Sequence, residues 1–379
     1  MKVVAAPDKF KGCLSAVVVA HAIAAGLRSA DPALEIDPCP MADGGEGTVA
    51  TLVAATAGRI ERRTVTGPLP GTTVEADFGI LGDHKTAVVE MASASGLALL
   101  RPEQRNPLRT TTYGTGELLA AAAKLGVEKI ILGIGGSATN DAGVGCAQAC
   151  GAVFTLNDGA RRTMHDPPLT GAEVERITRG TGCQPVSSFP RIEVACDVTN
   201  PLFGPAGAAR IFSPQKGATP EQVDHLDRAL HRLSTLFPHT DPATPGAGAA
   251  GGLGFGMLAF FGATLRPGFQ IVAEAARLPA RLSGAALCIT GEGRLDAQSL
   301  AGKTAIGVAR LCKAAGVPCV ALAGSIGDGV EPALAQGLTA WFSICDRPIS
   351  IEAAMQNAPR LLTTAAANVW RTARAIDRS

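Results

Sequence analysis

Acidic and basic side chains follow several short apolar runs of this chain, at points where glycine also appears. Each run has the length of a buried strand, and the residues that follow are Asp8, Lys9 and Lys11 after 3–6, Asp43 and Glu46 after 34–40, and Glu292, Arg294, Asp296 and Lys303 after 286–290. A fourth run, 317–323, ends in Gly324 and Ser325. Parallel strands bring such ends to one edge of a sheet, where open α/β proteins bind ligands. The pattern therefore predicts a site for anions and metal ions at that edge.

A glycine-rich segment, residues 133–143, follows another apolar run and precedes a helix that we expect to begin near Asn140 or Asp141. Backbone amides before a helix, together with the helix dipole, are typical of a phosphate-binding loop. Ser137 and Thr139 would add donors with Asn140, and Asp141 would hold a metal ion. The alternative interpretation is a tight turn capped by Asn140 or Asp141, because a glycine cluster alone says little about function.

Both kinds of side chain that phosphoryl transfer requires are present. A carboxylate accepts the proton of the acceptor hydroxyl, and cations stabilise the phosphoryl oxygens. Asp197, after the run 192–196, adds a carboxylate, and Lys216 adds a cation in a Pro-Gln-Lys-Gly-Ala segment. Mg²⁺ takes oxygen ligands, few of them from the protein, so these acids suffice for a magnesium site. Any single carboxylate could instead be a helix cap or a surface charge.

Three other kinds of catalytic motif are not supported by the sequence. Gly302-Lys303-Thr304 resembles the end of a P-loop, but the glycine required five places before Gly302 is Ala297. We therefore reject a Walker A motif and keep Lys303 as a phosphate contact. The histidines and cysteines do not show zinc spacing, and no Ser-His-Asp arrangement is indicated.

The composition is that of a globular protein acting on a small molecule. The 379 residues are 46% apolar and 18% charged, and 34 basic residues are intermixed with 33 acidic ones. A net charge of +1, with one Tyr and two Trp, offers neither a field nor a stacking surface for nucleic acid. Residues 242–265 carry no charge, but their many glycines favour a loop and a buried helix over a membrane span.

The cysteines and the start of the chain indicate the compartment. Ten cysteines without a Cys-x-x-C pair are typical of small buried residues in a reducing environment. The first apolar stretch, 3–6, is too short for a secretory signal. We expect a cytoplasmic protein without a membrane partner. The oligomeric state is not indicated, and a homodimer stays open.

The periodicity predicts two α/β domains. Strands at 2–7 and 34–40 alternate with helices near 14–30 and 46–58, and the same rhythm returns after residue 282 with strands at 286–290, 318–323 and 339–345 and helices at 304–316, 330–337 and 350–374. Between them, the short runs 60–66, 74–81 and 86–91 indicate antiparallel hairpins. We expect a doubly wound parallel-sheet domain of residues 1–66 and 271–379, interrupted by a mixed α/β domain of residues 67–270, with the active site in the cleft between them.

Six segments, taken together, resemble the bacterial glycerate kinase family of glycerate and glucarate catabolism. They are 7–12, 42–48, 135–141, 196–201, 214–218 and 290–296, and they span almost the whole chain in order. The resemblance implies ATP-dependent phosphorylation of D-glycerate with Mg²⁺, and a flavodoxin-like domain that carries a large inserted α/β domain. It favours the C2 hydroxyl and 2-phosphoglycerate, whereas the residues themselves do not separate C2 from C3.

With this activity in view, we assign each candidate residue a role. Asp197, Lys11 and Asp8 are the catalytic candidates, with Asp197 as the base; Gly135, Gly136, Ser137, Thr139, Asn140 and Lys303 bind the ATP phosphates; Lys9, Arg294, Asp43 and Glu46 bind the substrate; Asp296, Glu292 and Asp141 bind Mg²⁺. The alternatives are a kinase that forms 3-phosphoglycerate or acts on another small sugar acid, and a sensor that binds a nucleotide or an acid without turnover.

Overall fold

The computed structural model describes residues 1–180, 189–301 and 304–377. Its contacts divide the chain into two compact units. Unit 1 contains Met1–Asp43, Ala50–Ala57 and Val272–Ser379, and unit 2 contains Gly44–Val49 and Gly58–Ile271.

Unit 1 is built on a five-stranded parallel sheet in the order β14-β13-β12-β1-β2. The strands are β1 (Lys2–Ala5), β2 (Glu35–Pro38), β12 (Ala285–Leu295), β13 (Cys319–Ile326) and β14 (Ala340–Ser343). Counted within the unit, the order is 2-1-3-4-5, which is the flavodoxin-like order. The predicted fold class is therefore confirmed.

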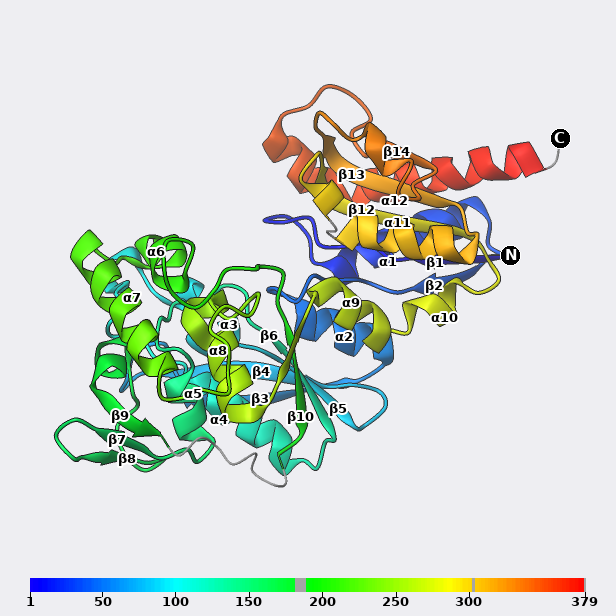
Figure 1. The fold of residues 1–379 in the computed structure, drawn as a ribbon. Helices are drawn as coiled ribbons and strands as arrows, with labels where there is room; N and C mark the ends of the chain where they lie inside the picture. Colours follow the sequence, from blue (N-terminus) through cyan, green and yellow to red (C-terminus); the bar gives the residue numbers. More distant parts are fainter. Residues whose placement is uncertain (181–188, 302–303, 378–379) are drawn as a thin grey trace. The chain divides into compact units, whose positions relative to one another are not determined.

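Helices cover both faces of this sheet, with α1 and α12 on one face and α11 on the other (Figure 1). The helices of the unit are α1 (Ala16–Ala30), α2 (Thr48–Thr56), α10 (Leu278–Leu282), α11 (Thr304–Ala315) and α12 (Ile351–Asp377). The first of them begins after Ser15, whose hydroxyl accepts the Val18 N–H, as is common at a helix start. Ile23 and Leu27 of α1 pack with Leu361 of α12 and Leu287 of β12 in the core.

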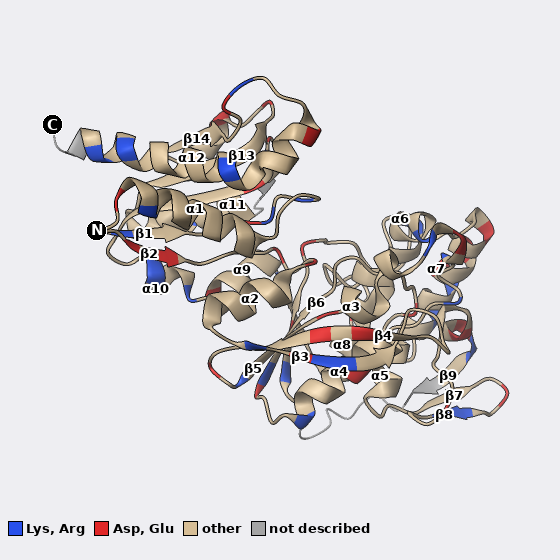
Figure 2. Cartoon of the chain, turned by 180° about the vertical axis from the view of Figure 1, so that it is seen from behind, with Lys and Arg blue, Asp and Glu red and all other residues tan. Residues whose placement is uncertain are grey.

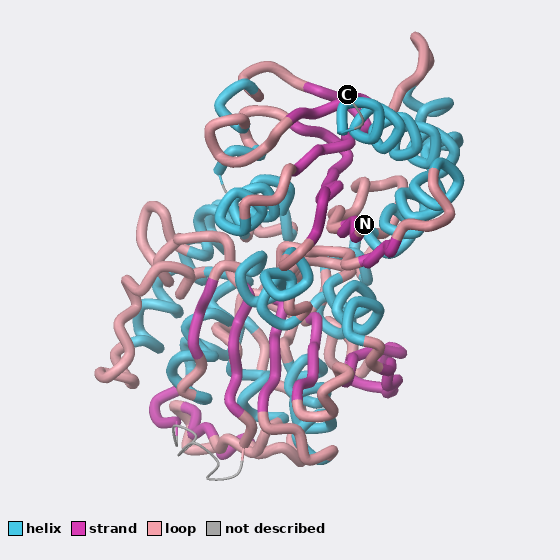
Figure 3. The backbone as a smooth tube through the Cα atoms, turned by 90° about the vertical axis from the view of Figure 1, so that its right-hand side faces the viewer, coloured by secondary structure: helices cyan, strands magenta, loops and turns pink. Residues whose placement is uncertain are grey.

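Unit 2 is built on a six-stranded sheet in the order β11-β10-β6-β5-β4-β3. Its strands are β3 (Arg59–Thr66), β4 (Thr73–Ile80), β5 (Thr86–Glu90), β6 (Lys129–Gly133), β10 (Arg191–Ala195) and β11 (Thr264–Arg266), and they run side by side with helices against them (Figure 3). The pairs β3–β4 and β4–β5 are antiparallel, so the predicted hairpins are confirmed. The other pairs are parallel. The sequence boundary near 66 falls at the end of β3, whereas all of β3 lies in this sheet.

The remaining elements of unit 2 include those that form a second hydrophobic core in the unit. They are α3 (Ala92–Ser95), α4 (Tyr113–Lys124), α5 (Val144–Ala149), α6 (Ala208–Phe212), α7 (Pro220–Ser234), α8 (Ala249–Phe261), α9 (Gly268–Ala275) and a small sheet of β7 (Phe154–Leu156), β8 (Arg161–Arg162) and β9 (Ile177–Gly180). Helix α9 continues into unit 1. Phe255 and Phe260 of α8 pack with Phe154 and Leu230 in this core.

Helix α8 occupies the uncharged stretch and is largely buried, as predicted. None of the helices in the described ranges is both long and apolar enough to cross a membrane. Three consecutive residues near the start of α8 have left-handed backbone: Ala250, Gly251 and Gly252, with φ of 54°, 68° and 88°. Gly251 accepts the Ala142 N–H at 3.0 Å. A Cβ on Gly251 would lie 2.0 Å from the Thr139 carbonyl oxygen, so this turn lies directly against the segment 139–142.

Three predicted elements differ from the structure. Strand β12 does not end at residue 290 but pairs with β13 as far as Leu295, opposite Ile326. Helix α5 begins at Val144 and is six residues long, because Gly143 before it is left-handed with φ 73°. The helix expected at 330–337 is only a 3-10 turn, Glu331–Ala333, with Pro332 inside it.

Candidate functional site

In unit 1, polar side chains gather at the topological switch point of the sheet. The chain leaves β1 toward β2 and leaves β12 toward β13, in opposite directions along the sheet, and ligands bind outside the carboxyl ends of such strands. The Asp8 N–H donates to the Gly291 carbonyl at 2.8 Å, which fixes the loop after β1 against β12. A Cβ on Gly293 would lie 3.3 Å from the Lys11 amide nitrogen, so the loop after β1 stays against β12 as far as Lys11.

Asp8 has the most perturbed carboxyl group of this edge. The residue is 8% exposed, and one of its carboxylate oxygens accepts the Lys9 N–H at 2.7 Å. Burial raises the pKa of Asp8 to about 6, and the negative charge of Asp43 adds to the rise. A carboxyl group with this pKa changes protonation close to neutral pH, as general acids and bases in active sites do.

The other predicted residues of unit 1 lie around Asp8 and along β12. Lys9 Nζ is 4.0 Å from an oxygen of Asp43, and Lys11 is exposed. Glu292 lies on β12 opposite Ala323. Arg294 forms a 2.9 Å ion pair with Asp296, and the Arg294 side chain is 68% exposed. Lys303 lies outside the described residues.

The donor set of unit 1 suits magnesium bound mainly by phosphate and water. Within the described ranges, no three carboxylates have oxygen atoms within 4.8 Å of one another. A closed cage of protein ligands is therefore not formed. Mg²⁺ usually binds through one or two carboxylates and completes its shell with phosphate oxygens and water, and Asp8 with Asp43 offers that number.

In unit 2, the carboxyl ends of three neighbouring parallel strands surround residues 44–49. Glu90, the last residue of β5, accepts the Val49 N–H at 2.7 Å and the Gly47 N–H at 3.1 Å. A Cβ on Gly133, at the end of β6, would lie 2.4 Å from the Gly44 carbonyl oxygen. These contacts hold the predicted substrate-binding loop, with the exposed Glu46 at its tip, against the end of the sheet.

The sequence analysis did not identify Glu90. The signal was the same as for Asp8 and Asp43, a carboxylate at the end of an apolar run. Its partners, however, are backbone amides more than forty residues earlier, which no local pattern reveals.

A buried lysine holds the glycine-rich loop that follows β6. Lys216 Nζ donates to the Ser137 hydroxyl and to the Thr139 carbonyl, both at 2.7 Å. The residue is 1% exposed. Burial lowers the pKa of Lys216 to about 7, and the negative charge of Asp141 opposes this effect. The loop is also tied to its neighbours through the Ala138 N–H, which donates to the Ser95 carbonyl at 2.9 Å.

Two oxygen atoms of this loop are buried and unpaired. Thr139 Oγ1 and Asn140 Oδ1 have no hydrogen-bond partner in the part of the chain that the structure describes, and both residues are 0% exposed. Asn140 uses its amide nitrogen to donate to Ser213. A buried polar atom without a partner costs about 1–3 kcal/mol, so such atoms are usually paired with water or a ligand. Of the two, the Thr139 hydroxyl can donate a hydrogen bond, whereas the Asn140 oxygen can only accept one and needs a donor such as water.

Asp141 is a structural residue in this arrangement, and its predicted role as a metal ligand is not supported. It is completely buried, and one oxygen accepts both the amide and the hydroxyl of Thr112 at 2.8 Å. The Gly143 and Gly145 amides donate to the same carboxylate. Burial raises its pKa. Because these donors already surround the carboxylate, Asp141 ties the start of α4 to the start of α5, as the capping interpretation expects.

Asp197 follows β10 and is exposed. Its Oδ1 accepts the Gly268 N–H at 2.8 Å, and Gly268 is the first residue of α9. This contact orients the carboxylate, and it also gives Asp197 a part in holding the start of that helix. Asp197 is therefore both a candidate base and a contact of the α9 start.

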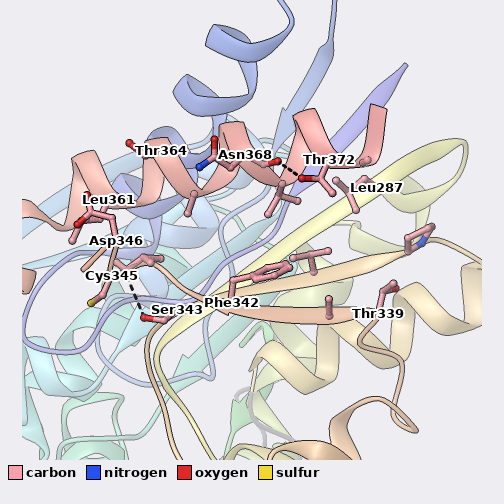
Figure 4. Close-up of a pocket in the computed structure, with 17 residues that line it drawn as sticks. Leu287, Thr339, Phe342, Ser343, Cys345, Asp346, Leu361, Thr364, Asn368 and Thr372 are labelled. Carbon is pink, nitrogen blue, oxygen red and sulfur yellow. Dashed lines mark hydrogen bonds between the residues drawn. The ribbon is translucent and has the colours of Figure 1, made fainter. Parts of the chain in front are cut away.

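A cavity elsewhere in unit 1 does not suit a phosphorylated ligand. It has a volume of about 490 Å³ and lies between β13, β14 and α12 (Figure 4). Leu287, Phe342 and Leu361 contribute apolar surface, and Asp346 is the one charged residue among the seventeen that line it. Without a lysine or arginine it offers no charge for a phosphate. Over the described chain, basic and acidic residues are interspersed in both units (Figure 2).

Comparison with known proteins finds relatives over the full length of the chain. Residues 3–374 match the sequence model of the glycerate kinase family. Glycerate kinase of Halalkalibacterium halodurans is 46% identical over 97% of each chain, and glycerate 2-kinase of Escherichia coli is 43% identical over 98% of each. The crystal structure of a provisionally named glycerate kinase 2 from Salmonella typhimurium LT2 matches with a TM-score of 0.89 and 46% identity, covering 100% of both chains.

Proposed function

Because the chain belongs to the glycerate kinase family, we propose that it transfers the terminal phosphoryl group of ATP to D-glycerate in the presence of Mg²⁺. The observation that carries this proposal is the identity of 43–46% to glycerate kinases over 97–98% of the chain. The carboxyl group of Asp8, whose pKa burial raises to about 6, supports it, since perturbed carboxyl groups are typical of active sites.

We assign the residues of unit 2 to binding the nucleotide and to removing the proton of the glycerate hydroxyl. The segment from Gly135 to Asn140 binds the ATP phosphates, with Lys216 holding its shape through Ser137 and Thr139. Asp197 accepts the proton of the glycerate hydroxyl. As that oxygen bonds to the terminal phosphorus, the bond from phosphorus to ADP breaks, and positioning with charge stabilisation supplies most of the catalysis.

We assign the residues of unit 1 to binding Mg²⁺ and the glycerate carboxylate. Asp8 and Asp43 would hold Mg²⁺, with Glu292 and Asp296 further along β12 as additional oxygen donors. When bound, the ion neutralises charge on the phosphate oxygens. Lys9, Lys11 and Arg294 are the cations for the glycerate carboxylate. The Asp43 and Asp296 ion pairs orient the side chains of Lys9 and Arg294.

We further propose that the acceptor is the C2 hydroxyl and the product is 2-phosphoglycerate. The name of the Escherichia coli relative, glycerate 2-kinase, supports this choice. We also propose that the protein acts in the cytoplasm, since the nine cysteines within the described residues are all free thiols and thiols persist in reducing compartments.

The test is ADP release from MgATP with D-glycerate, compared with L-glycerate, tartronate and glycerol. We expect turnover with D-glycerate and none after chelation of the metal. Equal activity with glycerol, or activity that a chelator does not affect, would contradict the proposal. ATP binding without ADP release would indicate a sensor instead.

The position of transfer is read from the product by proton-coupled phosphorus NMR. A phosphate on C2 couples to the single proton of that carbon and gives a doublet, whereas a phosphate on C3 couples to two protons and gives a triplet. A triplet would show that the C2 assignment is wrong while leaving the kinase assignment intact.

A further inference from the structure

Three cysteines that are distant in the sequence meet in the interior of unit 1. Cys288 on β12, Cys312 on α11 and Cys319 on β13 have sulfur atoms that all lie within 4.8 Å of one another. Each residue is 0% exposed. Cys288 and Cys319 are direct neighbours in the parallel pairing of the two strands. The sequence predicts only small buried residues here, because the spacing of the three cysteines does not resemble a metal motif.

We propose that Cys288, Cys312 and Cys319 form a binding site for a monovalent thiophilic cation such as Cu⁺ or Ag⁺. A metal–sulfur bond of about 2.3 Å places three sulfur atoms about 4 Å apart around a central ion. Sulfur atoms that all lie within 4.8 Å of one another are compatible with a triangle of this size.

The charge of the site selects a monovalent ion over zinc. A monovalent cation that replaces one thiol proton, which leaves as H⁺, makes a neutral unit with two remaining thiols. Zinc with three thiolates would leave a net negative charge in the core, where burying a charge is costly, and it usually takes four ligands. Within the described residues, no fourth His, Cys, Asp or Glu joins the cluster. Soft thiol ligands prefer soft ions.

The cluster lies away from the polar edge described above. Cys319 is the first residue of β13, and Cys288 lies near the start of β12, four positions before Glu292. Asp8 follows the carboxyl end of β1, and Glu292 lies in the second half of β12. Metal binding at the cysteines should therefore change the stability of unit 1 without contacting the residues to which we assign chemistry.

The experiment uses the full chain and Cu⁺ kept reduced by ascorbate, with a coloured chelator as the competitor. We expect one ion per chain at this site, and an affinity that falls by about 100-fold or more in Cys312→Ala, as loss of a metal-site partner causes. Cys39→Ala is the matched control, because Cys39 is also 0% exposed and in unit 1 but outside the cluster. Zn²⁺ should bind much more weakly than Cu⁺.

Unchanged affinity in Cys312→Ala, or equal loss in Cys39→Ala, would overturn the proposal. Equal binding of Zn²⁺ would overturn the charge argument that carries it. If Cys312→Ala does not fold, the wild type decides the question: one equivalent of Ag⁺ should raise its melting temperature, since an ion that binds only the folded chain stabilises it. No rise, or a fall, would show that the three thiols only fill space.

Discussion

Replacing Lys216 by methionine tests whether this lysine is buried at a cost in free energy. Methionine keeps a long apolar side chain but removes the amine that donates to Ser137 and Thr139. Burial lowers the pKa of Lys216 from 10.5 to about 7. Between these values the unfolded chain holds a proton that the folded chain has released. Stability must therefore rise with pH across this window in the wild type.

The expected size follows from the pKa difference. Each pH unit inside the window adds about 1.4 kcal/mol to the free energy of unfolding. From pH 7 to pH 9 the wild type should gain about 2 kcal/mol through this residue, because Lys216 is half protonated in the folded chain at the lower pH. The Lys216→Met variant lacks the group and should lack this gain.

The assay is urea denaturation at pH 7, 8 and 9, followed by far-ultraviolet circular dichroism. Tryptophan fluorescence is less suitable, since both tryptophans, Trp341 and Trp370, lie in unit 1, whereas Lys216 lies in unit 2. The matched control is Lys124→Met, which removes an exposed amine from α4 of the same unit. It should keep the pH dependence of the wild type. Parallel curves for the wild type and Lys216→Met would refute the reasoning, because they would mean that Lys216 stays protonated when buried.

Four further predictions concern the carboxylates. Asp197→Asn should lower kcat by about two to four orders of magnitude, as loss of a general base does, with a fall in melting temperature equivalent to about 1 kcal/mol for the Gly268 contact; normal kcat with a lowered melting temperature would show a helix cap only. The pKa of Asp8 is raised from 3.8 to about 6, so between these pH values the folded chain keeps a proton that the unfolded chain has lost, and the stability of the wild type falls as pH rises. By pH 7, urea denaturation should show Asp8→Asn to be more stable than the wild type by about 3 kcal/mol. Equal stability of the wild type at pH 7 and pH 4 would contradict this. Since ionised Asp8 is the form that binds a metal, kcat/KM of the wild type should fall below about pH 6; a flat profile down to pH 5 would exclude that role. Glu90→Gln should raise the KM for glycerate, because it weakens the hydrogen bonds from the Gly47 and Val49 amides. Unchanged steady-state kinetics would show that the loop 44–49 does not depend on this carboxylate.

The elements of unit 1 could be predicted from the sequence because each has a local signal. Apolar runs followed by glycine and charge mark the ends of β1 and β12, and their alternation with helical periods indicates a parallel sheet. The end of β12 was missed for a physical reason. Glycine at 291 and 293 suggests a turn, yet strand pairing with β13 continues past both glycines to Leu295.

The parts of the site that could not be predicted depend on tertiary contacts. A lysine in the sequence suggests a solvated cation, and only the packing around Ser137 and Thr139 makes Lys216 a buried donor. The position of Asp141 in a motif suggests a metal ligand, but its Thr112 contacts come from the residue before α4, almost thirty positions earlier. The three-cysteine cluster joins two strands and a helix, so no spacing along the chain could indicate it.

The left-handed turn at the start of α8 has a consequence for how saturation mutagenesis of this protein should be interpreted. Position 251 has no side chain and no chemical group that a substrate could use. Any Cβ there would nevertheless lie 2.0 Å from the Thr139 carbonyl, an oxygen that accepts a hydrogen bond from Lys216. A survey that ranks positions by lost activity would therefore score Gly251 with the reactive residues. A survey that also measured the amount of folded protein would show that the substitution acts through a steric clash with the main chain at Thr139.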